Sequence, residues 1–136
     1  MSAALCKEAM GELSTRTVKG FNFERAVDHL IEAAKTGVPT DFKKLATASG
    51  VFDESQQKWG NWATSALQLD RLCIYCVHHR LPQLTAMLGN AGGKTTDGVC
   101  AGFLKGLDAA GIDYNCEARV VYEEHRRDCI NWGRTA

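Results

Sequence analysis

The spacing of apolar residues predicts a first helix that begins near Asn22, a residue that commonly caps a helix N-terminus. Six apolar residues follow at the i, i+3, i+4, i+7 spacing of one helical face: Phe23, Ala26, Val27, Leu30, Ile31 and Ala34. Gly37 and Pro39 end this helix. A second, shorter helix is expected between Thr40, whose side chain can cap it, and Gly50. Its inner face carries Phe42, Leu45 and Ala46.

A third and longer helix is expected after the polar stretch 53–57, with Pro82 as its far limit. A broad apolar stripe predicts it, made of Trp59, Trp62, Ala63, Ala66, Leu69, Leu72, Cys73, Cys76 and Val77. Beyond Pro82, the apolar runs 84–88 and 99–104 flank the glycine-rich segment 89–93. That arrangement is typical of a β-hairpin or wing.

Helical spacing returns between Glu117 and Trp132. One face of this terminal helix is expected to hold Ala118, Val121, His125, Cys129 and Trp132. The charged residues Glu123, Glu124, Arg126 and Arg127 fall mostly on other faces. Before it, residues 105–116 allow a helical turn that Gly111 would end.

These elements predict a mainly α protein of the α+β class: a winged helix-turn-helix-like domain with a short β-hairpin and a C-terminal helix. A chain of 136 residues can bury one core, so we expect a single domain over 1–136. It would comprise an N-terminal extension (1–20), a winged-helix-like core (22–104) and a C-terminal helical segment (105–136).

Charge and composition narrow the function. Sixteen basic and sixteen acidic side chains cancel, so DNA binding would need a local basic patch. No apolar stretch approaches the roughly 20 residues that span a bilayer, and the first ten residues lack the pattern of a signal peptide. The six cysteines are expected to be reduced thiols. We therefore expect a cytoplasmic protein without a membrane partner.

Eight basic or imidazole side chains are candidates for contacting a nucleic acid or another partner. Five lie along or just after the third helix: Lys58, Arg71, His78, His79 and Arg80. Three more could flank a groove: Lys43, Lys44 and Lys94. Solubility alone also places such residues on a surface.

Two patterns could indicate metal or redox chemistry. Cys73 and Cys76 have the spacing of a zinc half-site, and His78 and His79 follow them. Both cysteines, however, occupy consecutive inward positions of a helix, which favours core packing and is the wrong place for a redox cysteine. The acidic cluster around His125 is explained more simply as a charged outer face, in which Glu124 and Asp128 with Arg127 allow pairing at i, i+3 or i, i+4 spacing. We expect no metal and no cofactor.

The segment from Gly89 to Thr96 is similar to a phosphate-binding loop, with glycines followed by Lys94 and two threonines. Its first glycine stands one residue too close to the Gly-Lys pair, and no buried parallel strand followed by a helix is expected around it. We interpret it as a flexible hairpin tip.

From Asp41 to Phe103 the chain also resembles small bacterial and phage proteins, in a short Leu-Ala helix (42–46), a long helix ending in Tyr75-Cys76, the segment 80–87 and a turn closing at Gly102-Phe103. The layout is similar to the DNA-binding domain of alkyltransferase-like proteins, where a helix-turn-helix precedes a strand and a wing-like loop. That family's alkyl-accepting enzymes carry a Cys-His-Arg run after a proline, whereas Pro82 here precedes Gln-Leu-Thr. The resemblance implies a scaffold that presents a helix to DNA, without alkyl transfer.

Together these observations lead us to expect a non-enzymatic binding protein. Its partner would be DNA or a host complex that processes nucleic acid or defends the cell, as for an inhibitor of restriction or CRISPR systems. The phage or mobile-element origin comes from the resemblance alone. The alternative is an enzyme, either a small metal-dependent nuclease using the C-terminal Glu and His residues or a thiol enzyme using Cys73 or Cys100 with a histidine.

Overall fold

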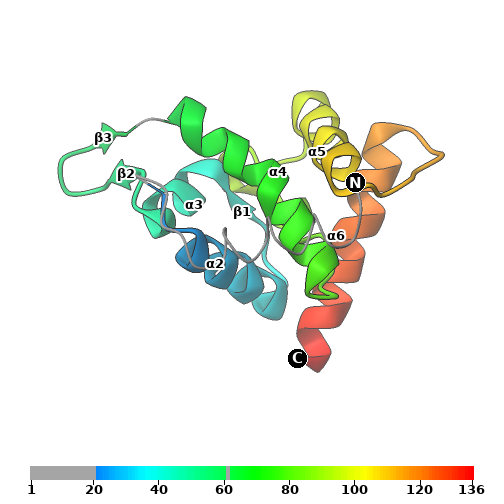
Figure 1. Ribbon diagram of the computed structural model, residues 1–136. Coiled ribbons are helices and arrows are strands. Elements are labelled where there is room, and N and C mark those ends of the chain that lie inside the picture. The colour runs from blue at the N-terminus through cyan, green and yellow to red at the C-terminus, as the bar shows by residue number, and fades with distance from the viewer. Residues whose placement is uncertain (1–20, 61) are drawn as a thin grey trace.

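The computed structural model describes residues 21–60 and 62–136, and of residues 62–67 the backbone only. This part of the chain is mainly helical, with short strands between the helices (Figure 1). The α-helices are α2 (Phe23–Thr36), α3 (Phe42–Ser49), α4 (Trp62–His78), α5 (Asp97–Ala110) and α6 (Ala118–Thr135). The 3-10 helices and strands are β1 (Thr40–Asp41), β2 (Phe52–Asp53), β3 (Lys58–Trp59), η1 (Leu84–Met87), β4 (Leu88–Gly89) and η2 (Ala91–Gly93). The expected α+β class, with a short hairpin and a C-terminal helix, is confirmed.

The helices enclose one hydrophobic core. Helix α2 packs on α3 and α6, and α5 packs on α4 and α6; α4 crosses the middle of the view in Figure 1. The largest fully buried side chains come from most of these elements: Phe21, Leu30, Leu45, Leu72, Leu84, Met87, Leu88, Leu107 and Tyr122. Each stabilises the fold by roughly 1.5–3 kcal/mol through loss of apolar surface to water. The core therefore depends on contacts between distant parts of the sequence.

The first predicted helix is confirmed, caps included. The Asn22 side chain accepts a hydrogen bond from the Arg25 amide at 3.1 Å, and Gly37 adopts the left-handed conformation that ends α2. Five of the six predicted inward residues are buried, and Ile31 is partly buried. Helical periodicity and cap chemistry are local signals, so the sequence alone was sufficient here.

The second helix is confirmed with a correction at its N-terminus. Helix α3 ends at Gly50 as predicted, but its N-cap is Asp41 and not Thr40. Asp41 Oδ1 accepts a hydrogen bond from the Lys44 amide at 2.8 Å. Thr40 lies in β1, with Oγ1 2.7 Å from His29 Nε2.

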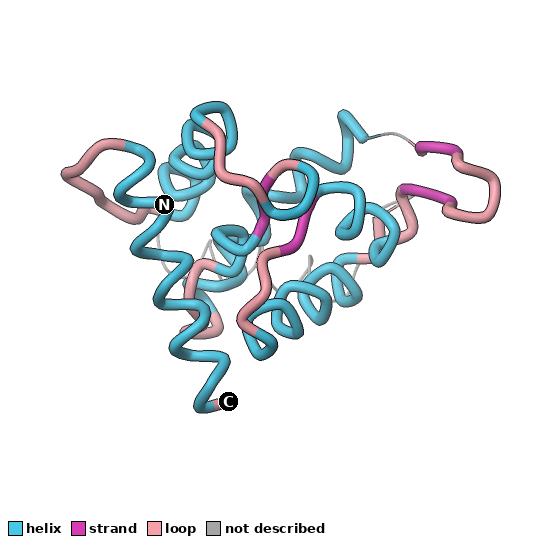
Figure 2. Tube along the Cα trace, turned by 180° about the vertical axis from the view of Figure 1, so that it is seen from behind, coloured by secondary structure: helices cyan, strands magenta, loops and turns pink. Residues whose placement is uncertain are grey.

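The hairpin expected within residues 84–104 is wrong. Residues 84–87 form η1, and the apolar run 99–104 lies inside α5, so it is helix and not strand. The antiparallel hairpin of this fold is formed instead by β2 and β3, with Phe52 opposite Trp59 and Asp53 opposite Lys58. Figure 2 shows it projecting at one end of the molecule.

The glycine-rich segment is a packed loop. Strand β4 pairs in parallel with β1, with Leu88 opposite Thr40, and the two strands lie near the centre of Figure 2. Gly89 and Gly93 are buried. A Cβ at Gly93 would lie 2.6 Å from the Pro39 Cβ, and one at Gly89 would lie 2.5 Å from the Gly93 carbonyl carbon. The expected flexible tip is therefore wrong, because tertiary packing fixes both glycines.

The long helix begins later than predicted. Leu72, Cys73 and Cys76 are buried as expected, but Trp59 belongs to β3, before the helix, and Val77 is 42% exposed. The side chains of Trp62, Ala63 and Ala66, assigned to the same stripe, lie outside the described residues.

Helix α6 follows its predicted face except at Arg126. Val121 and Cys129 are buried, and Ala118 and Trp132 pack against the core. Arg126, expected on the outer face, is half-buried and reaches across to the loop before α5. Its guanidinium donates to the carbonyls of Ala86 at 2.7 Å, Leu88 at 3.3 Å and Gly93 at 3.3 Å.

The proposed internal boundary at residue 104 falls inside α5, whose last residue is Ala110. Gly111 caps that helix in the left-handed conformation, as its sequence position predicts. The N-terminal extension (1–20) lies outside the described residues. Among the helices of the described part, none combines the length and apolarity needed to cross a membrane.

Asp41 links α3 to the glycine-rich loop, because its second carboxylate oxygen accepts a hydrogen bond from the Gly92 amide at 3.2 Å. Asp41→Ala is expected to lower the free energy of unfolding by about 2 kcal/mol, since both amides lose their acceptor. Asp41→Asn should cost about half as much, because an amide keeps one acceptor oxygen. Urea unfolding monitored by circular dichroism measures both variants. Unchanged stability of the alanine variant would show that water replaces both bonds.

Candidate nucleic-acid and partner interface

An aromatic and basic stack joins α3 to the β2–β3 hairpin. The rings of Phe52 and Trp59, which face each other across the two strands, have centroids 4.9 Å apart. Lys43 Nζ on α3 lies 4.8 Å from the centroid of the Phe52 ring. Phe52 is buried, whereas Trp59 is 44% exposed. The Phe52 ring thus contacts both the Trp59 indole and the Lys43 ammonium group.

The turn of this hairpin is organised by Asp53. Its Oδ1 accepts hydrogen bonds from the Ser55 amide at 3.0 Å, the Ser55 hydroxyl at 2.7 Å and the Gln56 amide at 3.2 Å. The Ser55 hydroxyl bond, followed by the backbone bonds, lowers the pKa of the Asp53 carboxyl because these bonds favour its charged form. Gln57, with φ of +51°, completes the turn. This local geometry sets the register that places Phe52 opposite Trp59.

A groove of about 470 Å³ lies between α3 and the hairpin. Its lining residues are His29, Asp41, Lys43, Lys44, Thr47, Ala48, Phe52, Glu54 and Gln57. Burial is the main cause that lowers the pKa of His29, and the nearby Asp41 charge opposes it. Both lysines are exposed. We refer to Lys43, Lys44, Phe52, Gln57 and Trp59 as the hairpin surface.

The structure separates the predicted binding residues into groups. Lys43 and Lys44 lie together on α3. Lys58 is next to Trp59 on β3, and since strand residues alternate in direction it points to the opposite side of the ribbon. Arg71 is exposed in the middle of α4, with Nη1 3.5 Å from Gln68 Oε1.

His78, His79 and Arg80 lie at the far end of α4, about 25 Å from its start beside the hairpin, given a rise of 1.5 Å per residue. The His79 ring stacks at 4.1 Å from the Tyr75 ring. These three exposed side chains therefore form a group of their own. One patch that includes all eight candidates does not exist in this fold.

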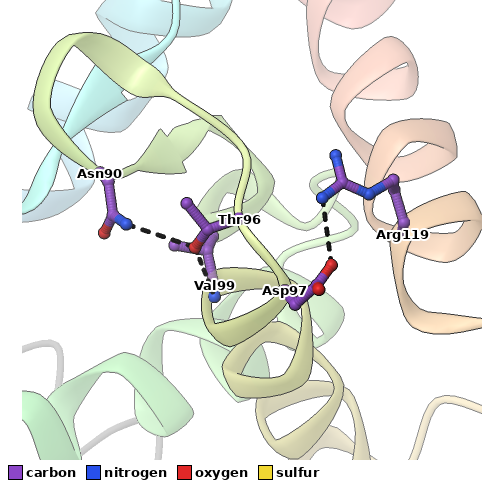
Figure 3. Close-up of polar contacts among 5 residues, drawn as sticks. All are labelled: Asn90, Thr96, Asp97, Val99 and Arg119. Atoms are coloured by element: carbon purple, nitrogen blue, oxygen red, sulfur yellow. Dashed lines mark hydrogen bonds and ion pairs between the residues drawn. The ribbon is translucent and has the colours of Figure 1, made fainter.

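Lys94, the eighth candidate, directly follows η2 in the loop that leads into α5. Thr96 caps α5, accepting from the Val99 amide at 3.2 Å and from the Asn90 amide group at 3.3 Å. In the first turn, Asp97 forms an ion pair of 3.1 Å with Arg119 of α6. Figure 3 shows both contacts at the start of this helix.

A parallel strand and a helix do flank this loop, contrary to expectation, since β4 precedes it and α5 follows. In the glycine-rich part of the loop, however, three consecutive amides already have partners in the protein. The Gly92 amide binds the Asp41 carboxylate, and the Gly93 and Lys94 amides donate to the Asn90 carbonyl. Asp97 adds negative charge where a phosphate would need positive potential. The loop therefore binds a carboxylate of the protein itself, that of Asp41.

Cys73 and Cys76 are core residues, 2% and 1% exposed, as their inward positions predict. Burial raises the pKa of Cys73 to about 12 and that of Cys76 to about 11, so both thiols are protonated at neutral pH. His78 and His79 are exposed, on the outside of the helix. Within residues 21–60 and 62–136, no three His, Cys, Asp or Glu side chains come together as a metal site.

The structure also shows the surroundings of the other residues that a thiol enzyme or a nuclease would use. Burial raises the pKa of Cys100, which leaves it protonated at neutral pH. His125 is half-buried with its ring 5.3 Å from that of Phe103, and burial lowers its pKa. Glu124 and Asp128 are both exposed.

Sequence reasoning missed two residues of the hairpin surface, Phe52 and Gln57, and assigned Trp59 to a helix. A signal was present: Phe52 and Trp59 flank the run Asp-Glu-Ser-Gln-Gln-Lys, in which Asp and Ser favour a turn. The two strands are only two residues long, too short for an alternating pattern to be visible.

Compared with protein-family models, curated proteins and solved structures, this chain matches none of them.

Proposed function

We propose that the protein is a non-enzymatic binding protein of the cytoplasm that acts on DNA or on a host complex that processes nucleic acid, through its hairpin surface. The observation that carries this proposal is the exposed indole of Trp59, supported by Phe52 beside Lys43. Aromatic faces next to lysines can hold bases and phosphates together. Tryptophan is also among the side chains that contribute most energy to protein interfaces.

Within this proposal the fold is a winged helix-turn-helix-like scaffold, in which the wing is formed by a different segment from the predicted residues 84–104. Helices α2 and α3 would be the helix pair, and the β2–β3 hairpin would be the wing. The order of helix, short helix and hairpin supports this assignment, as does the groove between α3 and the hairpin. Helix α3 would then enter the major groove, with the hairpin against the adjacent backbone.

The distribution of charge favours α3 over α4 as the contacting helix. Helix α3 carries Lys43 and Lys44 and no acidic residue after its cap, Asp41. Helix α4 carries one acidic residue, Asp70, and one arginine, Arg71. A helix with net positive charge attracts phosphates, whereas a balanced one does not.

A protein partner is supported by a different observation, the net charge of zero. Tight binding to a nucleic acid usually needs more positive charge than this chain has, whereas a protein interface can be built around one tryptophan with a polar rim. In this form the protein would dock on a restriction or CRISPR complex and obstruct it. The phage or mobile-element origin belongs to this proposal and rests on the sequence resemblance.

The test is a gel shift with single-stranded and duplex DNA over a series of salt concentrations. Trp59→Ala is expected to weaken binding about tenfold, since stacking one base contributes roughly 1–3 kcal/mol. Lys43→Ala combined with Lys44→Ala should flatten the dependence of log K on log salt by about 1.4 for a single strand and 1.8 for a duplex.

A matched control removes two exposed positive charges elsewhere, with Lys35→Ala at the end of α2 and Arg134→Ala at the end of α6. This pair should leave the salt dependence unchanged. No shift with either DNA at low salt would eliminate the DNA partner. A pull-down from nuclease-treated host extract, compared with the Trp59→Ala variant, would then test the protein partner.

Catalysis, metals and cofactors have no part in this proposal. The thiol enzyme would need an activated cysteine, and burial raises the pKa of both Cys73 and Cys100. The nuclease would need metal ligands, and the described residues do not form such a group. Stoichiometric zinc in the purified protein, or nuclease activity abolished by a chelator, would replace the binding proposal with the enzyme alternative.

A further inference from the structure

A second hollow lies between α4 and α5, and Phe42 of α3 also lines it. It has a volume of about 600 Å³ and reaches β4, the loop before α5, and Tyr122 of α6. That volume is within the 300–1,000 Å³ range of sites that bind small molecules. Its wall is largely apolar, with Leu69 on α4 and Val99 and Phe103 on α5.

Glycines on α5 create the space. Gly98, Gly102 and Gly106 follow one another at a spacing of four residues, so they share a face of the helix, and all three line the cavity. At Gly106 the two helices are in close contact, because a Cβ there would lie 2.6 Å from Cys73 Sγ. At Gly102 a Cβ would meet no atom within 4 Å. The cavity therefore opens beyond the Gly106–Cys73 contact.

Within the part of the chain that the structure describes, the carboxylate of Asp70 on the wall has no hydrogen-bond or ion-pair partner. Asp70 of α4 is half-buried, and its Oδ1 lies 3.9 Å from the Cβ position at Gly106. Among the described residues, its carboxylate makes no hydrogen bond and no ion pair. Lys105, which also lines the cavity, is exposed and forms no ion pair with it.

Three other polar side chains of the wall, those of Thr85, Thr96 and Tyr122, are already bonded. Thr85 Oγ1 lies 3.3 Å from Cys73 Sγ, and Thr96 is occupied by its cap bond and by Asn90. The Tyr122 hydroxyl donates to the Leu88 carbonyl. A ligand would therefore find a negatively charged acceptor, the Asp70 carboxylate, next to an apolar surface.

We propose that this cavity binds a small primary amine with a hydrocarbon body. The ammonium group would donate to the Asp70 carboxylate, and the hydrocarbon would cover Leu69, Val99 and Phe103. A charge-assisted hydrogen bond in a partly desolvated site is about twice as strong as a neutral one. The cavity thereby selects a cation over a neutral or anionic molecule of the same length. This inference is independent of the hairpin surface and of the proposed function.

The test is a titration of the 15N-labelled protein with hexylamine, hexanol and hexanoate, monitored by the movement of backbone amide signals. The expected result is binding of hexylamine at least about tenfold tighter than hexanol, with shifts concentrated in α4 and α5. Hexanoate should bind more weakly than hexanol. Equal affinity for the amine and the alcohol, no binding of the amine, or shifts spread over the surface would each overturn the proposal.

Two variants and a control make the test specific. Asp70→Asn should reduce the preference for the amine to less than about twofold, because the charge is lost while the shape is kept. Gly102→Leu should abolish binding of all three probes by filling the cavity, and its amide spectrum shows whether it folds. Asp28→Asn, which removes an exposed carboxylate on α2, should leave the preference unchanged. An undiminished preference in the Asp70→Asn variant would overturn the proposal.

Discussion

Arg126→Ala is expected to lower the free energy of unfolding by about 3 kcal/mol. The guanidinium donates to three backbone carbonyls, those of Ala86, Leu88 and Gly93. Hydrogen bonds from a charged donor contribute about 1.5–3 kcal/mol each, and acceptors left without a partner lose that contribution. The Arg126 guanidinium carbon also lies 4.7 Å from the centroid of the Tyr122 ring. Thermal unfolding should show a decrease in Tm of roughly 10 °C.

Arg127 supplies the control, because it is the next residue of α6 and is exposed. Arg127→Ala should change the free energy of unfolding by no more than about 0.5 kcal/mol. Arg126→Lys should recover only part of the lost stability, since an ammonium group cannot reach several carbonyls with the planar geometry of a guanidinium. If the alanine variants at 126 and 127 were equally stable, the bonds to the loop would contribute nothing net.

Gly133→Ala is expected to destabilise the protein by about 3 kcal/mol. Helix propensity alone would predict that this substitution stabilises it. Alanine in a helix interior is ordinarily about 1 kcal/mol more favourable than glycine. Here α6 crosses α2 so closely that a Cβ at Gly133 would lie 2.7 Å from the Lys35 backbone nitrogen and closer still to the Ala34 carbonyl. Backbone atoms cannot move aside as a flexible side chain can, so the helices must separate. Chemical unfolding in urea measures the change.

The matched substitution is Gly102→Ala in α5, where a Cβ would meet no atom within 4 Å. It should stabilise the protein by about 0.5–1 kcal/mol, because only the helix propensity changes. The two glycine variants are thus expected to change the free energy of unfolding in opposite directions. A stabilising Gly133→Ala would falsify the close crossing of α2 and α6.

The first two helices show why part of the fold was predictable. Asn22 caps α2, and Gly37 and Gly50 end α2 and α3, as the sequence indicates. These signals act between residues three or four positions apart. The cap of α3 was placed one residue too early because both Thr40 and Asp41 can accept the bond, and the pairing of β1 with β4 decides between them.

The hairpin and the glycine-rich loop show why the rest was not predictable. Residues 99–104 are apolar and short, and such a run fits a strand or a buried helix equally well. Glycines suggest a mobile turn, whereas Gly89 and Gly93 are needed for close contacts with each other and with Pro39. Those contacts depend on residues brought together only by folding.

For the candidate site, the sequence indicated some of the residues involved but not how they are arranged in space. Lys43 and Lys44 were predicted as contact residues together with Lys94, and the structure places the first two, without Lys94, along the groove between α3 and the hairpin. The contact of Lys43 with Phe52, and of Phe52 with Trp59, could not be inferred from spacing along the chain. The same holds for Asp70, whose carboxylate is notable only because α5 opposite it carries glycines.

By itself, the sequence determined the helical class, most helix ends, and the inward positions of Cys73 and Cys76, because hydrophobic periodicity and cap chemistry operate within one element. Only the tertiary structure decided which strands pair, that Arg126 turns inward, and which charged groups lie beside an open cavity. The physical reason is that these features arise from contacts between residues tens of positions apart, where burial and the satisfaction of backbone hydrogen bonds outweigh local preference.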